Sequence, residues 1–378
     1  MRIEQRHWDM SEGWRARVAG EPPLDAHLVL VFGCRSAFAD PSGIAVLRAR
    51  YPAATMFGCS TAGEIVGTRV FDQTLVATAV RFDRTRVRLA RVDLADAAGS
   101  ESAGEAVARE LAGPDLVHVV VLSEGLHVNG SALVAGLTRS LPPHVAVTGG
   151  LSGDGDRFEE TIVLAGDVLR GGQVAAVGLY GDALTIGYGS MGGWDQFGPD
   201  RVVTRSSGNV LHELDGRPAL ELYRRYLGPH ADGLPSSGLL FPLSLRSGGS
   251  HGVVRTILGI DEESGSMTFA GDIPQGAVVR LMKANFDRLL DGATGAATTC
   301  HEAIGGRTPE LALLISCVGR KLVLKQRVEE EVESVRDVLG QGAVLAGFYS
   351  YGEISPFTPS ARCELHNQTM TITTLSER

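Results

Sequence analysis

Two short loops of this sequence carry a hydroxyl side chain and a glutamate at the same spacing. Residues 58–65 are GCSTAGEI and residues 347–354 are GFYSYGEI, so each loop has a glycine, a hydroxyl residue three positions later, and then Gly-Glu-Ile. Backbone N–H groups, hydroxyls and the carboxylates of Glu64 and Glu353 can together cradle a small molecule. The same residues also suit a tight turn, where glycine permits a positive φ and the hydroxyl caps the turn. The residues alone leave both interpretations open.

The elements around these loops recur, and a third copy lies between them. Each copy runs strand, polar turn, helix, strand, Gly-rich polar loop, strand, over residues 28–82, 116–180 and 311–375. The middle loop is GGLSGDGDRFEE, residues 149–160. The loops align as Gly58, Gly149 and Gly347, then Thr61, Ser152 and Ser350, then Gly63, Asp154 and Gly352.

This repetition predicts an α/β fold with mixed sheets, built from strand-helix-strand units, covered by helices and divided into two modules. Ligands of such sheets lie outside the strand ends, where these loops are expected. Asp40 and Pro41 predict a helix start, and Gly340 predicts the end of a charged helix over residues 324–339. The runs 160–169 and 173–180 predict a hairpin across RGG.

The stretch after the second copy has a different pattern, with paired strands, long loops and two helices. We therefore expect a domain boundary near residue 210. The predicted organisation is an N-terminal segment over 1–24, an N-terminal module over 25–210 and a C-terminal module over 211–378.

Other polar clusters allow more than one interpretation. The loop 149–160 lacks the P-loop and EF-hand spacings, which leaves a divalent-cation site at Asp154 and Asp156 as the alternative to a turn. Arg35 and Arg320 each follow a buried strand, where a guanidinium can clamp a ligand carboxylate or pair with a neighbouring loop. The run CELHNQTMT, residues 363–371, suits either a buried polar network or ligand recognition.

Composition limits the function classes. The 378 residues are 44% hydrophobic and 21% charged, with a formal net charge of −9, which argues against general binding of nucleic acid or anionic membranes. No apolar run is long enough for a transmembrane helix, and the N-terminus lacks the apolar core of a signal peptide. The five cysteines lack metal or disulfide spacing and are expected to be reduced thiols. We expect a cytoplasmic protein without membrane insertion.

No nucleophile motif occurs, because GCSTAG does not match the G-x-S-x-G spacing and the carboxylates show no pairing specific to acid-base chemistry. We therefore expect a binding protein and not an enzyme, with an enzyme acting on small metabolites as the lower alternative.

Several of these motifs, in this order, resemble the FIST family, the F-box and intracellular signal transduction proteins. The resemblance runs from about residue 25 to the end and includes FGCSTAGEI, GGLSGDGDRFEETIVL, GDIPQGAVVRLM, CVGRK and GFYSYGEISP followed by CELHNQTMT. It implies a stand-alone bacterial FIST protein with an N-terminal and a C-terminal module. Such a protein would sense a small, amino-acid-like ligand and signal to a separate partner, such as a histidine kinase or a cyclic-di-GMP enzyme.

The resemblance also implies an alternative, a haem-binding nitric oxide sensor, for which His366 and His212 are the axial candidates. No cofactor is otherwise expected. The motif positions taken as ligand-binding candidates are Thr61, Gly63, Glu64, Ser152, Asp154, Arg205, Arg320, Tyr351, Glu353 and Asn367.

Overall fold

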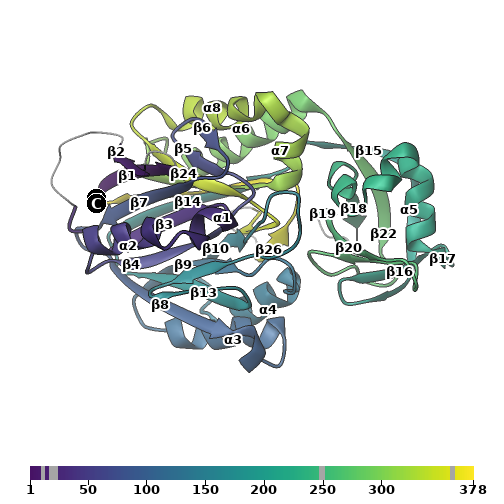
Figure 1. Cartoon of the computed structure of the whole chain (residues 1–378), viewed down its shortest axis with the longest axis horizontal. Helices are drawn as coiled ribbons and strands as arrows, with labels where there is room; N and C mark the ends of the chain where they lie inside the picture. Colours follow the sequence, from purple (N-terminus) through teal and green to yellow (C-terminus); the bar gives the residue numbers. More distant parts are fainter. Residues whose placement is uncertain (10–12, 17–23, 247–251, 358–361) are drawn as a thin grey trace.

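The chain forms a body of three repeated units, with a smaller domain inserted into the third unit (Figure 1). The structure, a computed structural model, describes residues 1–9, 13–16, 24–246, 252–357 and 362–378. The N-terminal segment expected over residues 1–24 lies partly outside these ranges. The predicted α/β class, with mixed sheets and helices, is confirmed.

Each unit has the same sheet order. Its first core strand pairs in parallel with the strand after the helix and antiparallel with the last strand of the unit. Another strand then pairs with that last strand. The first unit has β1 (Arg2–Asp9), β3 (Leu28–Gly33), α2 (Pro41–Arg50), β4 (Thr55–Ser60) and β7 (Leu75–Arg81). The second has β8 (Arg86–Asp93), α3 (Ser100–Leu111), β9 (Leu116–Ser123), α4 (Gly130–Ser140), β10 (Ala146–Leu151) and β13 (Gln173–Tyr180). The third has β14 (Leu184–Met191), α6 (Phe286–Ala303), β23 (Leu311–Cys317), α8 (Val328–Leu339), β24 (Val344–Ser350) and β27 (Met370–Glu377).

The three units exchange hairpins in a cycle. The hairpin that follows each Gly-rich loop leaves its own unit and completes the sheet of another. The first unit's hairpin pairs with β24, the second unit's with β4, and the third unit's with β10. These hairpins are β5 (Glu64–Val66) with β6 (Arg69–Phe71), β11 (Val163–Ala165) with β12 (Val168–Arg170), and β25 (Gly352–Pro356) with β26 (Cys363–His366).

The three aligned glycines lie within strands, at the point where each exchanged hairpin joins. Gly58, Gly149 and Gly347 each pair with their unit's first core strand on one side and with an incoming hairpin strand on the other. A Cβ atom at any of them would lie 1.8 Å from a carbonyl oxygen of the neighbouring strand. Close backbone approach therefore explains why glycine recurs at this position.

The capping residues in the sequence predicted where α2 begins. The Asp40 carboxylate accepts a hydrogen bond from Ser42 N at 2.8 Å, and α2 begins at Pro41, as predicted. The helices cover the outer faces of the sheets (Figure 1). The inner faces of all three units share one apolar cluster, which includes Leu30, Val177 and Phe348. No helix of the described residues is long and apolar enough to cross a membrane.

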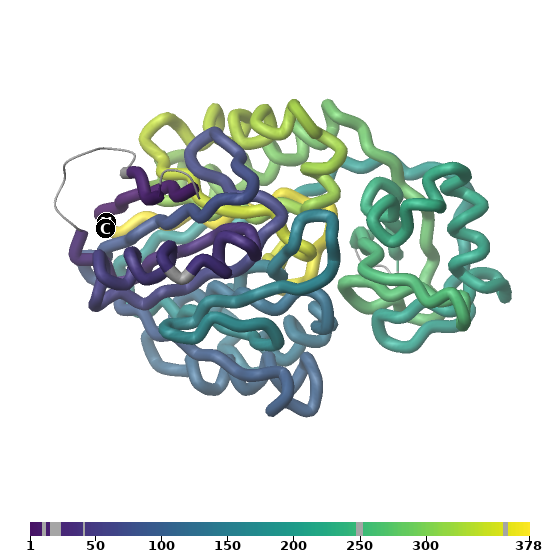
Figure 2. The backbone as a smooth tube through the Cα atoms, viewed as in Figure 1, coloured from purple at the N-terminus to yellow at the C-terminus, as the bar shows by residue number. Residues whose placement is uncertain are grey.

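The inserted domain, residues 194–284, occupies the connection between β14 and α6. Figure 2 shows it as a separate lobe, while the two ends of the chain lie side by side in the three-unit body. The Met1 ammonium is 3.8 Å from the Glu377 carboxylate. One curved sheet carries the helix α5 (Ala219–Leu227). Its strands are β15 (Trp194–Ser207), β16 (Val210–Leu214), β17 (Arg217–Pro218), β18 (Leu243–Arg246), β19 (Val253–Arg255), β20 (Ile257–Asp261), β21 (Ser266–Phe269) and β22 (Val278–Ala284).

Two local predictions were wrong. The strands on either side of RGG belong to different sheets, and the hairpin instead turns at Gly166, whose φ is 60°. The helix expected over residues 324–339 begins only at Val328, because Lys325 adopts a φ of 50° and separates it from a shorter helix, α7 (Val318–Leu324). The predicted hairpin across RGG is absent because β11 and β12 form the exchanged hairpin, which pairs with β4 of another unit.

The close approach of each aligned glycine to the first core strand of its own unit predicts that this glycine is essential for stability. Gly347→Ala should lower the free energy of unfolding by about 3 kcal/mol, because the added methyl group forces the strands apart. Urea unfolding would measure this. Gly342→Ala is the matched control, because a Cβ there meets only a methyl group at 3.4 Å. Equal unfolding midpoints for the two variants would contradict the proposed role of this glycine.

Candidate functional site

Three backbone hydrogen bonds join the Gly-rich loops into a closed ring. Ala62 N donates to Tyr349 O at 2.8 Å, and Gly153 N donates to Ser60 O at 2.9 Å. The third bond, from Tyr351 N to Leu151 O, measures 3.2 Å. Each loop donates one of these three bonds and accepts another, and Tyr349 N also donates to Gly63 O at 2.8 Å, so the strand ends of all three units meet at one place.

Beside this ring, Glu64 is a buried carboxyl bound by two hydroxyls. Thr61 Oγ1 donates to it at 2.6 Å and Thr74 Oγ1 donates at 2.7 Å. Burial raises the pKa of Glu64 to about 7, although the two hydroxyl bonds favour its anion. Its protonation state therefore changes near neutral pH.

Glu353 occupies the equivalent position in the third unit. Ser350 Oγ donates to it at 2.7 Å, and Thr369 donates from both Oγ1, at 2.9 Å, and its backbone N, at 3.1 Å. Burial raises the pKa of Glu353 to about 8. The two Gly-Glu-Ile copies thus build the same hydroxyl–carboxyl arrangement in two units.

The second unit lacks this arrangement. Its register places Val163 where the other units have glutamate, because Leu164 pairs with Gly58 as Ile65 pairs with Gly347. Ser152 Oγ consequently donates to the carbonyl of Ser123, at 2.8 Å, and has no carboxylate to bind. The three copies therefore share a backbone and differ in chemistry.

A pocket of about 190 Å³ opens beside Glu64, with walls from all three units. The first unit contributes the turn after β3, its Gly-rich loop and both ends of the exchanged hairpin, the second contributes its Gly-rich loop, and the third contributes α7. The lining residues are Cys34, Thr61, Ala62, Gly63, Glu64, Asp72, Gln73, Gly155, Asp156, Arg157, Val318, Lys321 and Leu322.

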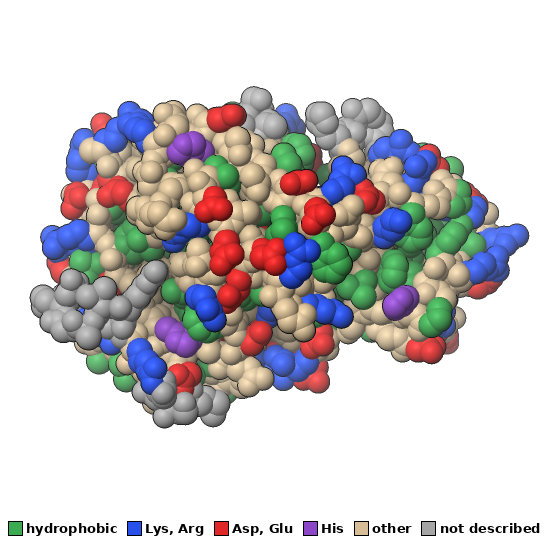
Figure 3. Space-filling view, turned by 90° about the horizontal axis from the view of Figure 1, so that it is seen from above, with side chains coloured by type: hydrophobic (Ala, Val, Ile, Leu, Met, Phe, Trp, Pro, Cys, Tyr) green, Lys and Arg blue, Asp and Glu red, His purple; other side chains and the backbone are tan. Residues whose placement is uncertain are grey.

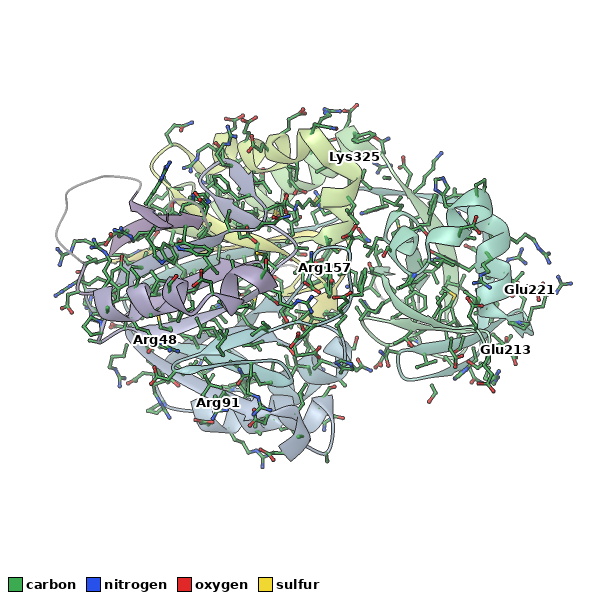
Figure 4. All side chains as sticks on the ribbon, viewed as in Figure 1. Arg48, Arg91, Arg157, Glu213, Glu221 and Lys325 are labelled. Carbon is green, nitrogen blue, oxygen red and sulfur yellow. The ribbon has the colours of Figure 1, made fainter. Side chains whose placement is uncertain are left out.

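The pocket presents charges of both signs. Lys321 Nζ donates to the carbonyl of Ala62 at 2.7 Å and pairs with Asp72. Arg157 donates from Nε to Asp154 at 3.1 Å, and its side chain is 46% exposed. Figure 4 shows Arg157 on the side of the body that faces the inserted domain. The pocket therefore holds charges of both signs, and both cations are paired within the protein.

Comparison with known proteins identifies the chain's family. Residues 27–217 match the FIST N domain and residues 219–356 match the FIST C domain. The chain belongs to the FIST family. FIST domains imply a role in sensing and signalling.

Known relatives add little about what this FIST protein binds. Two uncharacterized proteins from strains of Mycobacterium tuberculosis are each 30% identical to it over 237 residues. Each match covers 59% of this chain and 59% of the relative, which is less than two thirds of the relative's length. The crystal structure of a cyanuric acid hydrolase from A. caulinodans aligns with 100% of this chain and 99% of its own, at 10% identity and a TM-score of 0.39.

The structure brings some predicted ligand-binding residues of the FIST protein together. Thr61, Gly63 and Glu64 line the pocket. Two more support its wall: Asp154 binds Arg157, and the Tyr351 hydroxyl donates to Gly155 O at 3.1 Å. Ser152 lies behind them, bonded to its own unit.

Two predicted arginines lie elsewhere. Arg320 is fully buried, with Nε 2.6 Å from Glu331 and its other nitrogens bound to the carbonyls of Gly192 and Leu289. It joins α7, α8 and α6 and does not line the pocket. Arg205 is an exposed residue of β15 that pairs with Glu213, which Figure 4 labels at the far end of the inserted domain.

The segment 366–369 joins the FIST protein's inserted domain to its body. Asn367 Oδ1 accepts from Thr256 N at 3.3 Å, and its Nδ2 donates to Tyr351 O at 3.3 Å. Gln368 Nε2 donates to Leu239 O at 3.0 Å, and the next residue, Thr369, binds Glu353. The buried polar network considered for CELHNQTMT is therefore present, and it places Asn367 and Glu353 at the domain contact.

The surroundings of His366 do not fit haem ligation. Its ring is buried, its Nε2 lies 2.9 Å from Ser355 O, and burial lowers its pKa to about 4. An iron ligand needs a ring nitrogen that faces an open slot. His212 is a half-buried residue of β16, in the inserted domain. Asp154 binds arginines, and the described residues contain no cluster of three metal-ligating side chains.

Lys321, Asp72 and Arg157 were not among the predicted site residues. Lys321 directly follows Arg320 in CVGRK, and the motif predicted a site role for Arg320. A helix at this point turns the two side chains about 100° apart, and α7 directs Arg320 inward and Lys321 to the pocket. A helical period through CVGRK would therefore have indicated Lys321, but a polar turn was expected at this point.

The raised pKa of Glu353 predicts how stability depends on pH. An ordinary glutamate loses its proton near pH 4.5, whereas folded Glu353 keeps it up to about pH 8. Between these pH values the folded state therefore binds more protons than the unfolded state. The stability that protonated Glu353 contributes is lost as the pH rises from 4.5 to 8, at up to about 1.4 kcal/mol per pH unit. Glu353→Gln should flatten this fall in urea unfolding experiments. An unchanged slope would refute the assignment, and exposed Glu263→Gln is the control.

Proposed function

We propose that this FIST protein is a non-enzymatic sensor that binds an amino-acid-like metabolite in the pocket beside Glu64. The observation that carries the proposal is the mixed charge of this pocket of about 190 Å³, whose lining includes the Lys321–Asp72 ion pair, Arg157 and Glu64. A ligand carboxylate would pair with the cations, and a ligand ammonium would pair with the acids.

Binding would be communicated through the inserted domain. Ser236 Oγ of that domain donates to Asp156 O at 3.0 Å, and Asp156 lines the pocket. A ligand that moves the second unit's loop would therefore act on this contact and on the 366–369 segment beside it. A ligand shifts an arrangement only by its differential affinity for the two states.

We further propose that the signal passes to a separate protein, such as a histidine kinase or a cyclic-di-GMP enzyme. The family's sensing and signalling role supports this proposal. Ligand-dependent capture of such an enzyme by the purified protein is the direct test of this step.

Thermal-shift and calorimetric screens of amino acids and related metabolites would test the binding step. A ligand at about 100 times its Kd should stabilise the fold by about 2.7 kcal/mol. Lys321→Met should weaken binding about tenfold or more, because the ligand's carboxylate loses a charged partner. Lys325→Met, at an exposed lysine labelled in Figure 4, is the matched control.

Two results would count against the sensor. If no metabolite in a broad panel binds, or if Lys321→Met and Lys325→Met bind equally well, the pocket is not the site. Conversion of a bound ligand into a product would show an enzyme and not a sensor. Thr61 and Glu64, a hydrogen-bonded hydroxyl–carboxyl pair that lines the pocket, would then be the first residues to test.

A further inference from the structure

A second pocket lies between the β1–β2 hairpin and the β5–β6 hairpin, where β2 spans Gly13–Ala16. Its volume is about 230 Å³, and it shares no lining residue with the pocket beside Glu64. We call it the arginine groove. The side chains that matter to the argument are Arg6, His7, Arg15, Arg69 and Phe71.

Every ionisable residue that lines the arginine groove is basic, in a chain with a net charge of −9. By contrast, Figure 3 shows acidic and basic side chains interspersed over the face viewed from above, with acidic ones near its centre. Acidic residues outside the lining offset part of this charge: Arg6 is 3.1 Å from Glu4, and Arg69 is 2.8 Å from Glu329. Gathering three guanidinium groups around one hollow favours a bound anion, whereas burial lowers the pKa of His7 and disfavours its charged form.

Two nitrogens of the groove residues lack hydrogen-bond partners. Arg6 Nε and His7 Nε2 are buried, and neither has a partner among the residues that the structure describes. Buried polar groups of folded proteins are normally hydrogen-bonded, so unsatisfied ones need an explanation. An anion held among these side chains would bring acceptor oxygens to them.

One wall of the groove is flat and aromatic. The rings of His7 and Phe71 lie 4.3 Å apart with an angle of 30° between their planes. The sheets hold this wall firmly, because Phe71 pairs with Glu64 across the β5–β6 hairpin and Gln5 Nε2 donates to Leu345 O at 2.9 Å. A planar ligand group can pack on such a surface.

We propose that the arginine groove binds a small oxyanion, carried on a molecule whose flat part packs against Phe71. Arginine guanidinium groups match both phosphate and carboxylate, since their N–H donors can bind two oxygens at once. The proposal does not depend on the metabolite pocket, and either site can fail without the other.

Calorimetry of the full chain with inorganic phosphate, pyrophosphate and citrate, at constant ionic strength, tests the oxyanion. We expect one-to-one binding of at least one probe, and the preferred probe distinguishes a phosphate from a carboxylate ligand. Arg69→Gln should weaken that binding about tenfold or more. The Arg69 side chain is 69% exposed, so the variant should fold, which circular dichroism would verify.

Arg225→Gln is the matched control. Arg225 is also an exposed arginine, 60% accessible and 3.0 Å from a glutamate, but it lies on α5 of the inserted domain. Unchanged binding in this variant, together with weakened binding in Arg69→Gln, would support the groove. Absence of binding by all three probes would overturn the proposal, as would an equal loss in both variants, which would show a general effect of net charge.

Discussion

The ring of three backbone hydrogen bonds is the constraint on which the rest of the structure depends. Ala62, Gly153 and Tyr351 each donate to the loop of another unit, so no loop can shift without moving both others. Gly58, Gly149 and Gly347 lie in the strands that lead into the ring, and a Cβ atom at each would clash with a carbonyl oxygen of its own unit's first core strand, which explains why glycine occupies these positions. A pocket with walls from three separate units follows from this arrangement.

Given equivalent backbones, the chemistry of each unit depends on a few side chains. Glu64 and Glu353 occupy matching positions with matching hydroxyl partners, whereas the second unit has Val163. The inserted domain packs on the segment that binds Glu353, while Glu64 lines an open pocket. A pseudosymmetric body thereby gains two different carboxyl sites, one at a domain contact and one beside an open pocket.

The sequence predicted those features that local chemistry determines. The Asp40 cap, the Pro41 helix start, the Gly340 helix end and the buried strands all depend on a few neighbouring residues. The recurring loop also pointed to Thr61, Gly63 and Glu64, and the structure places all three around one pocket. Exchange of the hairpins was not predictable in this way, because any exposed strand edge can accept a hairpin and local propensity does not choose among them.

The same limit explains the arginines. Arg320 and Arg35 follow equivalent strands and look alike in sequence, yet Arg320 is buried against Glu331 and Arg35 pairs with Glu159 and Glu160 near the surface. Glu331 lies on α8, which Lys325, with a φ of 50°, separates from the helix α7 that carries Arg320. The partner of Arg320 thus depends on the break between two helices, which the residues next to Arg320 do not determine.

Exchange of the hairpins makes the two FIST regions interdependent. The boundary between the matched regions, at residues 217–219, falls beside β17, inside the inserted domain. A fragment ending there would leave the edge of β10 without β25, and the remaining fragment would leave β24 without β5. Each piece would expose a strand edge, which favours aggregation. The two regions are therefore interlocked halves of one folding unit, and either half would need the other present in order to fold.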